Sequence, residues 1–207
     1  MKSLKKIFPL IVAACLLCGN SFAQAAKEVK YQILPASKLS IDGTSTFHKF
    51  TIKATELDGY LEINGTNSNG NLKAELENVG TLNVVVPVKK LNSGENSMND
   101  NMDKALKADN NPNITFTLKN IAVSNEKTSE GDPLKIYANG ILTIAGVSKE
   151  INMTVESSKT KDGLVHFTGE QSLKMTDYGV KPPTMFFGTV TVGDAVTVHF
   201  NLALASM

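Results

Sequence analysis

The sequence predicts an all-β protein, an antiparallel barrel of about eight strands with a short helical cap. Apolar and polar residues alternate in many short runs separated by turn dipeptides such as Asp42-Gly43, which is typical of half-buried strands. Only one segment has helical spacing, so the long crossovers that parallel strands need are missing. Residues 134–144 alternate throughout, and at about 3.3 Å per residue such a strand is on the order of 30 Å long. This length favours a closed barrel over a simple sandwich.

The first residues of the chain, 1–25, have the pattern of a secretory signal peptide. A basic start with three lysines precedes the apolar run 7–17, which is too short for a permanent membrane span. Ala23–Ala25 matches a small-residue cleavage site, so the mature chain is expected to begin at Ala26. The expected location is periplasmic or secreted. The alternative is a lipoprotein anchored at Cys15, although this cysteine lies inside the apolar run.

The remaining residues, 26–207, suit one domain of ordinary size. Both cysteines lie in the signal, so the mature chain has no disulfide, thiol nucleophile or thiolate metal ligand. Without the signal lysines the chain carries 18 Lys against 20 Asp and Glu, a formal charge of −2, and it has no arginine. No basic patch stands out, so nucleic acid is not an expected partner. The bidentate clamp that arginine offers to phosphate or carboxylate is also absent.

Alternation predicts the strands in order. The runs are 29–33, 39–41, 50–54, 61–63, 72–76, 82–88, 114–118, 121–123, 134–144, 151–155, 165–167, 173–175, 190–192 and 196–204. Asn69-Gly70 predicts a hairpin that leads into 72–76. Pro87 cannot donate to a ladder, so a bulge or a sheet edge is expected there.

One helical segment lies between the strands that end at residue 88 and begin at residue 114. Met98 and Met102 recur at a spacing of four on one apolar face. Asn96 or Ser97 can cap the start, and Pro112 stops the helix because proline disfavours helix at the residue before it. We expect this segment to be a lid or end cap of the barrel. A helix that only covers the core is the alternative.

No motif in the sequence supports catalysis. It lacks G-x-S-x-G, a P-loop, G-x-G-x-x-G and H-E-x-x-H. His199 lies between Val198 and Phe200 on a strand, so it is expected to face solvent. The run Asn99–Asp103 alternates oxygen ligands but lacks the glycine and the distant glutamate of a calcium loop. No catalytic residue, metal or cofactor is therefore predicted.

Loop residues indicate a ligand mouth at one end of the barrel. His48 and Lys49 lie in a hydroxyl-rich turn and are the candidates for contact with a ligand head group. Phe186 and Phe187 follow two prolines, where polar loop residues are the norm. Flat Phe and flexible Met suit the mouth of a cavity for a hydrophobic ligand. The alternative is that they plug the barrel end, because pockets and cores share this composition.

Several blocks of the sequence, taken in order, resemble the YceI family of lipid-binding proteins. They are Leu39–Phe50, Leu91–Gly94, Met102–Asp109, Pro112–Phe116, Gly140–Gly146 and Thr176–Pro183. The resemblance covers nearly the whole mature chain. It implies an extended, eight-stranded antiparallel lipocalin-like barrel with a helical cap, formed by 26–207. It also implies a long internal pore for a polyisoprenoid or similar amphiphile, in the bacterial periplasm. One departure is that Met98–Met102 replaces the Arg-Asp-x-His pattern at the helix start, so the identity of the head group, and with it the ligand class, stays open.

Inward positions of the predicted strands, with residues at the mouth, are the candidates for ligand binding. They are Val84, Val86, Val88, Met102, Phe116, Leu118, Leu142, Ile144, Phe186, Phe187, Val198, Phe200 and Leu202. A register error of one residue on any strand turns lining into exterior.

The expected function is non-catalytic binding, storage or transport of a long-chain amphiphile such as an isoprenoid quinone or prenyl phosphate. The alternative is a structural or interaction barrel without a ligand. An enzyme acting on a lipid is disfavoured because no nucleophile–base pair is evident. The expected partner is a hydrophobic small molecule, without nucleic acid or a permanent membrane span. The oligomeric state, a homodimer included, stays open.

Overall fold

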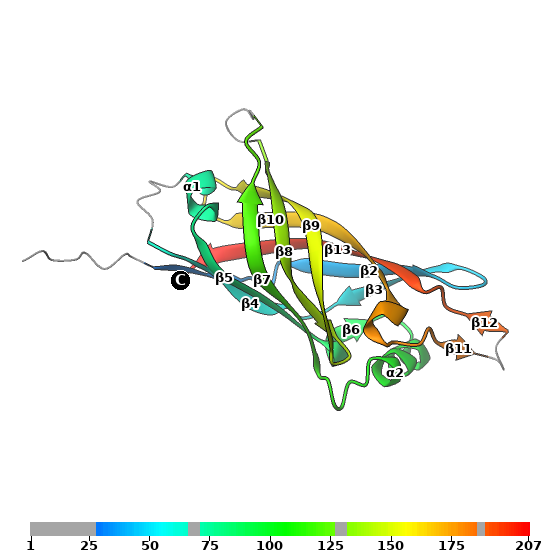
Figure 1. Ribbon diagram of the computed structural model, residues 1–207. Helices are drawn as coiled ribbons and strands as arrows, with labels where there is room; N and C mark the ends of the chain where they lie inside the picture. Colours follow the sequence, from blue (N-terminus) through cyan, green and yellow to red (C-terminus); the bar gives the residue numbers. More distant parts are fainter. Residues whose placement is uncertain (1–27, 66–70, 127–131, 186–188) are drawn as a thin grey trace, which may run out of the picture.

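The computed structural model describes residues 28–65, 71–126, 132–185 and 189–207. Strands dominate these ranges, as Figure 1 shows. The strands are β1 (Val29–Ile33), β2 (Lys38–Thr44), β3 (Lys49–Ala54), β4 (Asp58–Ile63), β5 (Val79–Pro87), β6 (Leu91–Asn92), β7 (Asn113–Val123), β8 (Leu134–Ile144), β9 (Val147–Lys159), β10 (Val165–Lys174), β11 (Thr184–Met185), β12 (Val190–Thr191) and β13 (Ala195–Ser206). The helices are α1 (Leu72–Leu76) and α2 (Asn96–Ala105), with short 3₁₀ turns η1 (Val88–Lys90) and η2 (Met175–Tyr178).

The strands close into an eight-stranded antiparallel barrel, which confirms the predicted fold class. Three barrel strands are each made of two segments, which are β1 and β2, β3 and β4, and β5 and β6. They are followed around the ring by β7, β8, β9, β10 and β13, so the order around the barrel follows the chain. The last strand, β13, pairs again with β1 and β2 and so completes the ring. Neighbours in sequence are thus neighbours in space, as short connections between antiparallel strands favour.

Three of the eight strands are interrupted, each made of two segments that follow one another. Ile33 of β1 lies opposite Leu204, and Lys38 of β2 lies opposite Asn201, so β1 and β2 follow one another along β13. In the same way β3 pairs with β2, and β4 pairs with β1. Pro35, which has no amide hydrogen to donate, lies in the first interruption.

A β-bulge in β7 keeps apolar side chains on the inner face. Leu118 lies opposite Gly140, whereas Asn120 lies opposite Asn139, so the register shifts by one residue between them. A bulge of this kind changes which residues face inward. The inner series therefore passes from Leu118 to Ile121, and both side chains line the interior.

The turn between β8 and β9 is as short as an antiparallel hairpin allows. Ala145 and Gly146 form it, with φ of 50° and 82°. Two successive positive φ values are the pattern of a type I′ turn, whose twist matches that of the strands. Ala145 is buried against Tyr178 and Val180 of the neighbouring segment, which gives a reason for alanine at a position that favours glycine or asparagine.

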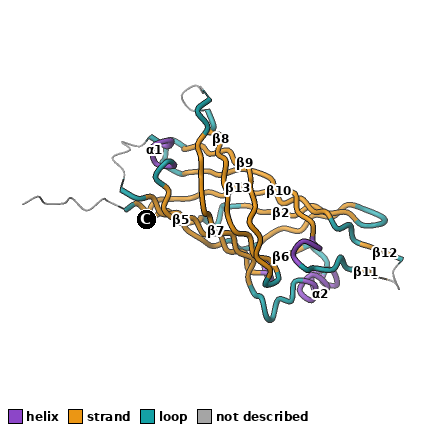
Figure 2. Tube along the Cα trace, viewed as in Figure 1, coloured by secondary structure: helices purple, strands orange, loops and turns teal. Residues whose placement is uncertain are grey.

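The helices lie at opposite ends of the barrel, as Figures 1 and 2 show. α1 lies in the connection from β4 to β5, where the sequence predicts a strand, and that prediction is wrong. The side chain of Asn71 caps α1 by accepting a hydrogen bond from the Ala74 amide at 3.1 Å. The dipeptide Asn69-Gly70, predicted to form a hairpin, lies outside the described residues.

α2 is the predicted helical cap, with different ends from those expected. Its N-cap is Glu95, one residue before the expected caps, and no side chain caps it. The helix ends well before Pro112, because Lys107 takes a left-handed backbone with φ of 54°. A left-handed residue just after the last turn is a common way to end a helix.

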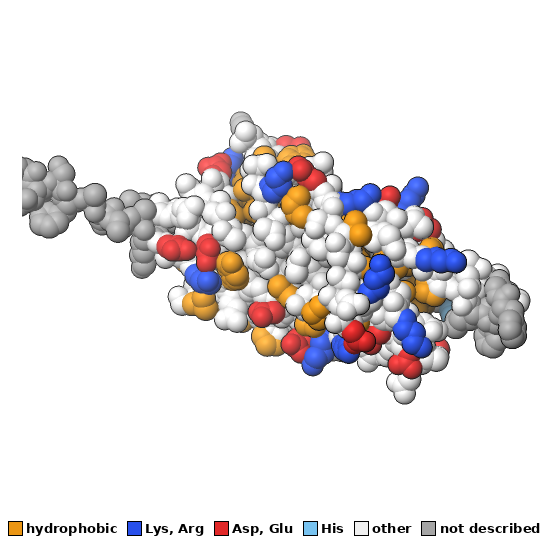
Figure 3. Space-filling model, turned by 60° about the horizontal axis from the view of Figure 1, so that its bottom comes forward, with side chains coloured by type: hydrophobic (Ala, Val, Ile, Leu, Met, Phe, Trp, Pro, Cys, Tyr) orange, Lys and Arg blue, Asp and Glu red, His pale blue; other side chains and the backbone are white. Residues whose placement is uncertain are grey.

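The described surface carries mixed charge. In Figure 3, lysines and acidic side chains alternate over one face of the molecule, with hydrophobic side chains scattered among them. His199 is on the outer face, as predicted, and its ring nitrogens lie 3.3 Å from Asp42 and 3.5 Å from Glu170. Among the described residues, no helix has both the length and the apolar character that crossing a bilayer requires.

Candidate functional site: an apolar cavity inside the barrel

One cavity of about 310 Å³ runs inside the barrel. Its wall includes Leu61 and Leu76 near the end that α1 covers, and Met98 and Met102 near the end that α2 covers. The same space therefore reaches from one half of the barrel to the other. Its volume lies at the lower end of the range of about 300–1,000 Å³ that is typical of small-molecule sites.

The inner side chains of β13 show where the cavity is open. Val196, Val198 and Phe200 face the cavity and are only half-buried. Further along the same strand Leu202 and Leu204 are buried, at 5% and 0% exposure. Because the first three side chains point inward, their exposure is to an internal space. The cavity is thus wide in the α2 half of the barrel, the hollow half, and narrows among the buried side chains of the α1 half, the packed half.

The closed half is held by a continuous cluster of buried side chains. The most buried of them, each at or below 1% exposure, are Leu61, Ile63, Leu76, Ile136, Val165 and Leu204. They come from α1 and from strands on several sides of the ring. α1 therefore seals this end, and its Leu76 forms part of the cavity floor.

The opposite end is covered by the apolar face of α2. Met102 is buried, and Met98 and Leu106 pack beside it against the inner faces of β2, β3 and β7. These side chains also line the cavity. Unbranched methionines adapt to ligands of different shape, so a flexible apolar lid borders the hollow half.

The polar side chains of the wall all belong to the α2 half. They are Ser45, His48, Asn101, Gln171, Lys174 and the phenol of Tyr178, and every other wall residue in the described part of the chain is apolar. They come from the β2–β3 turn, α2, the end of β10 and η2, which converge at this end. Burial raises the pKa of the Tyr178 phenol, with a smaller contribution from Asp177, so the phenol stays neutral near pH 7.

Eleven of the predicted lining and head-group residues form the cavity wall. They are Val84, Val86, Met102, Phe116, Leu118, Leu142, Ile144, Val198, Phe200, Leu202 and His48. Their part in binding a ligand stays a prediction. Phe186 and Phe187 lie outside the described residues.

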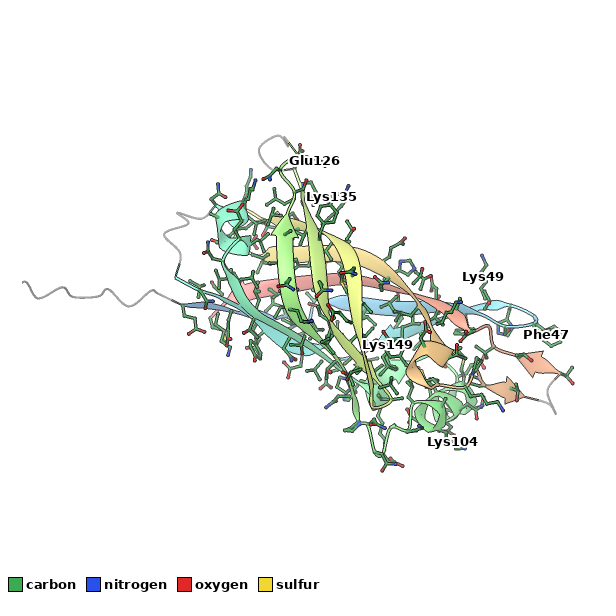
Figure 4. All side chains as sticks on the ribbon, viewed as in Figure 1. Phe47, Lys49, Lys104, Glu126, Lys135 and Lys149 are labelled. Atoms are coloured by element: carbon green, nitrogen blue, oxygen red, sulfur yellow. The ribbon has the colours of Figure 1, made fainter. Side chains whose placement is uncertain are left out.

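Two predicted site residues lie away from the wall. Val88 continues the alternation of β5, but Pro87 ends that strand and η1 turns the chain. Val88 is therefore buried outside the cavity, with its amide donating to the Pro112 carbonyl at 2.8 Å. Lys49 is exposed at the start of β3, and in Figure 4 it points away from the barrel on the hairpin that carries Phe47 at its tip.

Ser45, Asn101 and Lys174 were missed by the sequence reasoning. Ser45 belongs to the same hydroxyl-rich turn as His48, so a signal was present for it. Asn101 lies one turn from Met98 on the helix, and Lys174 is the last residue of β10. Their convergence depends on how distant connections meet at one barrel end, which local patterns do not encode.

The fold and the site define a class: a closed antiparallel barrel with an apolar interior and polar groups at one end only. The sequence model of the YceI-like domain matches residues 37–204, and the chain belongs to that family. A comparison with curated proteins found no match.

Solved structures share the fold. A polyisoprenoid binding domain from Saccharophagus degradans, implicated in plant cell wall breakdown, is 16% identical with a TM-score of 0.64, over 86% of this chain and 98% of that chain. BcnA from Burkholderia cenocepacia is 19% identical with a TM-score of 0.63, over 81% and 95%. The Campylobacter jejuni YCEI protein is 21% identical with a TM-score of 0.54, over 75% and 84%.

Proposed function

We propose that this protein binds one long-chain amphiphile inside the barrel, without chemistry, and stores or transports it. A polyisoprenoid, such as an isoprenoid quinone or a prenyl phosphate, is the ligand class that fits best. The observation that carries the proposal is the cavity, whose deep wall is wholly apolar from Phe116 to Leu76. The polyisoprenoid-binding domain among the structural neighbours supports the same ligand class.

Burial of the ligand chain supplies the affinity. Each buried methylene contributes about 0.8 kcal/mol, so one isoprene unit gains a few kcal/mol gross before the costs of ordering the chain are met. This driving force needs no polar contact along the chain. A wall of Val, Ile, Leu and Phe can therefore hold a tail along its length.

The distribution of polar groups gives the ligand its direction. Ser45, His48 and Lys174 border the cavity only at the α2 end. A polar head group left in the apolar α1 half would lose its hydrogen bonds to water, at a cost of several kcal/mol. The tail therefore enters first, toward Leu76, and the head group stays beneath α2.

The N-terminal segment supports a periplasmic site of action. If residues 1–25 are removed on export, intact mass spectrometry of the protein from a periplasmic extract gives a chain that starts at Ala26. A mass that includes a lipid on Cys15 would instead establish the lipoprotein alternative. A chain of full mass would contradict both.

Native mass spectrometry tests the function. The protein, purified without detergent and then incubated with vesicles that contain an isoprenoid quinone, is expected to carry one lipid molecule. A bare polypeptide after both steps would favour a structural barrel without a ligand.

A matched pair of variants links the bound lipid to the cavity. Leu118 faces the cavity, and its neighbour Thr117 is exposed on the outside. Leu118→Asp places a carboxylate in the apolar wall and is expected to abolish lipid retention. Thr117→Asp adds the same charge outside and is expected to retain it. Equal retention by two folded variants would place the lipid elsewhere.

A further inference from the structure

Three phenylalanines of the cavity wall each lie over a glycine of the neighbouring strand. The pairs are Phe50 with Gly43, Phe116 with Gly140, and Phe200 with Gly169. In each pair, carbons at the far end of the ring occupy the space next to the glycine Cα where a Cβ would stand. The rings therefore lie along the wall instead of crossing the cavity.

Glycine is needed at these three positions because the rings occupy the space of a side chain, and not because of the backbone conformation. The φ angles of Gly43, Gly140 and Gly169 lie outside the left-handed range, so other residues can adopt them. Gly94 and Gly163 are the contrast, because each has a φ of +87° and no heavy atom within 4 Å of a Cβ. A glycine inside a strand weakens it, and an aromatic ring laid over the glycine restores packing.

Two of the pairs stand where the hollow half meets the packed half. β7, which carries Phe116, and β13, which carries Phe200, are four strands apart in the ring of eight and so form opposite walls. Phe200 lies between half-buried Val198 and buried Leu202. Phe116 and Phe200 both pack against the buried cluster of the α1 half. The two rings thus face each other across the entrance to that half.

We propose that the pairs Phe116–Gly140 and Phe200–Gly169 determine the chain length that the cavity accepts. With glycine beneath them, the rings lie flat and the cavity continues into the α1 half. A methyl group at either glycine turns the ring into the cavity and shortens it. This inference rests on the proposed function, in which the tail enters from the α2 end. A short tail ends before the rings, whereas a long one must pass between them.

Gly169→Ala is the sharper of the two tests. Its Cβ meets Phe200 Cζ at 2.7 Å, and the nearest backbone atom, the Thr154 oxygen, is 3.2 Å away, so the ring moves first. At Gly140 the Thr117 backbone oxygen is only 2.6 Å from a Cβ, which forces the wall itself to shift.

The measurement is a competition within one sample. The protein is incubated with phosphatidylcholine vesicles that carry equal amounts of farnesol and solanesol, a short and a long isoprenoid alcohol, and the bound alcohols are quantified by mass spectrometry after re-isolation. Gly169→Ala is expected to lower the ratio of solanesol to farnesol about tenfold, because part of the long chain loses its burial. The ratio counts only protein that binds, so partial unfolding does not disturb it.

Control variants separate the ring from general destabilisation. Gly163→Ala strains the turn between β9 and β10 and meets no atom, so the ratio is expected to stay unchanged. Gly169→Ala combined with Phe200→Leu removes the displaced ring and is expected to restore the ratio. Phe200→Trp enlarges the ring without a change at glycine and is expected to lower the ratio, which keeps the test decisive if Gly169→Ala does not fold.

The outcomes distinguish two failures. Wild-type protein that carries neither alcohol contradicts the proposed function, and the inference falls with it. If wild-type protein carries both alcohols and Gly169→Ala leaves their ratio unchanged, the inference alone is overturned. If Gly169→Ala does not fold, an unchanged ratio in Phe200→Trp has the same meaning. A lowered ratio that Phe200→Leu does not restore also overturns it, because the ring is then not the cause.

Discussion

The Nζ of Lys159 lies 2.9 Å from Oε1 and 3.0 Å from Oε2 of Glu75, a residue that is only 6% exposed. Glu75 belongs to α1, and Lys159 is the last residue of β9. The Tyr31 hydroxyl of β1 donates to the same carboxylate at 3.2 Å. One buried carboxylate therefore fastens α1 to two strands that are far apart in the sequence.

We predict that Glu75→Ala lowers the free energy of unfolding by about 2 kcal/mol, because it leaves a partly buried ammonium and a hydroxyl without their acceptor. Urea denaturation gives this value. Lys73→Ala is the matched control on the same helix, since its contacts with Glu77 and Asn125 are exposed, and its expected effect is below about 0.5 kcal/mol. Equal losses for both variants would show that the carboxylate is not what holds α1.

The stability of the α2 end is expected to depend on acid pH through Asp194. The Thr176 amide and hydroxyl donate to its carboxylate at 2.9 Å and 2.7 Å, and these hydrogen bonds hold the pKa of Asp194 below its usual value. A carboxyl with a lowered folded pKa stabilises the fold above its unfolded pKa of about 4, and this contribution is lost as the pH falls through the folded pKa.

Thermal unfolding of wild type and Asp194→Asn across the acid range tests this dependence. The variant is expected to have a lower Tm than wild type at neutral pH, and the difference is expected to shrink as the pH falls. Asp162 lies in the β9–β10 turn at the other end of the barrel, and a hydrogen bond with Thr160 lowers its carboxyl pKa in the same direction. The Tm difference of the matched variant Asp162→Asn is therefore expected to shrink with falling pH in the same way. A Tm difference for Asp194→Asn that does not vary with pH would contradict the assignment.

A better N-cap is expected to stabilise α2. Glu95 has the extended backbone of an N-cap, with φ of −125° and ψ of 122°, but its side chain makes no capping hydrogen bond. Serine at this position can accept from a free amide of the first turn, so Glu95→Ser is expected to raise the free energy of unfolding by about 0.5–1 kcal/mol. If α2 is the lid, lipid release to acceptor vesicles also slows. Higher stability with unchanged release would show that the ligand leaves by another route.

Local alternation was enough to predict the barrel and most of its wall. On β13, Val198, Phe200 and Leu202 alternate with polar neighbours, and the structure places all three on the cavity wall. The same rule, applied to β3, would have turned Lys49 outward, because Phe50 beside it faces inward. Lys49 was assigned to the head-group site because its turn is rich in hydroxyl groups, without regard to the face of the strand on which it lies.

The remaining errors involve partners that are distant in the sequence. Leu72–Leu76 alternates as a strand does, yet it folds as a helix, because Leu76 enters the buried cluster and Glu75 meets Lys159 and Tyr31. Val88 continues the alternation of the inward-facing residues of β5, but the proline before it ends the strand. In both cases tertiary contacts outweigh a short local pattern.

Lys174 offers a way to identify the chemical class of the head group of the proposed ligand. Among the described lysines it is the one on the cavity wall, at the α2 end, and the chain has no arginine. A prenyl phosphate bound as proposed would have Lys174 as its cationic neighbour on the wall, whereas an uncharged isoprenoid alcohol would gain little from it. Because Lys174 is exposed, solvent screening limits the interaction to about 1 kcal/mol.

Lys174→Met is accordingly expected to weaken the binding of farnesyl phosphate about fivefold and to leave farnesol unchanged. Displacement of cis-parinaric acid by each ligand, at low and at high salt, measures both. Lys49→Met removes an equivalent charge that points away from the barrel and is expected to change neither. Equal effects of Lys174→Met on phosphate and alcohol would mean that the lysine packs against the chain, and the head group would then be an uncharged one such as a quinone ring.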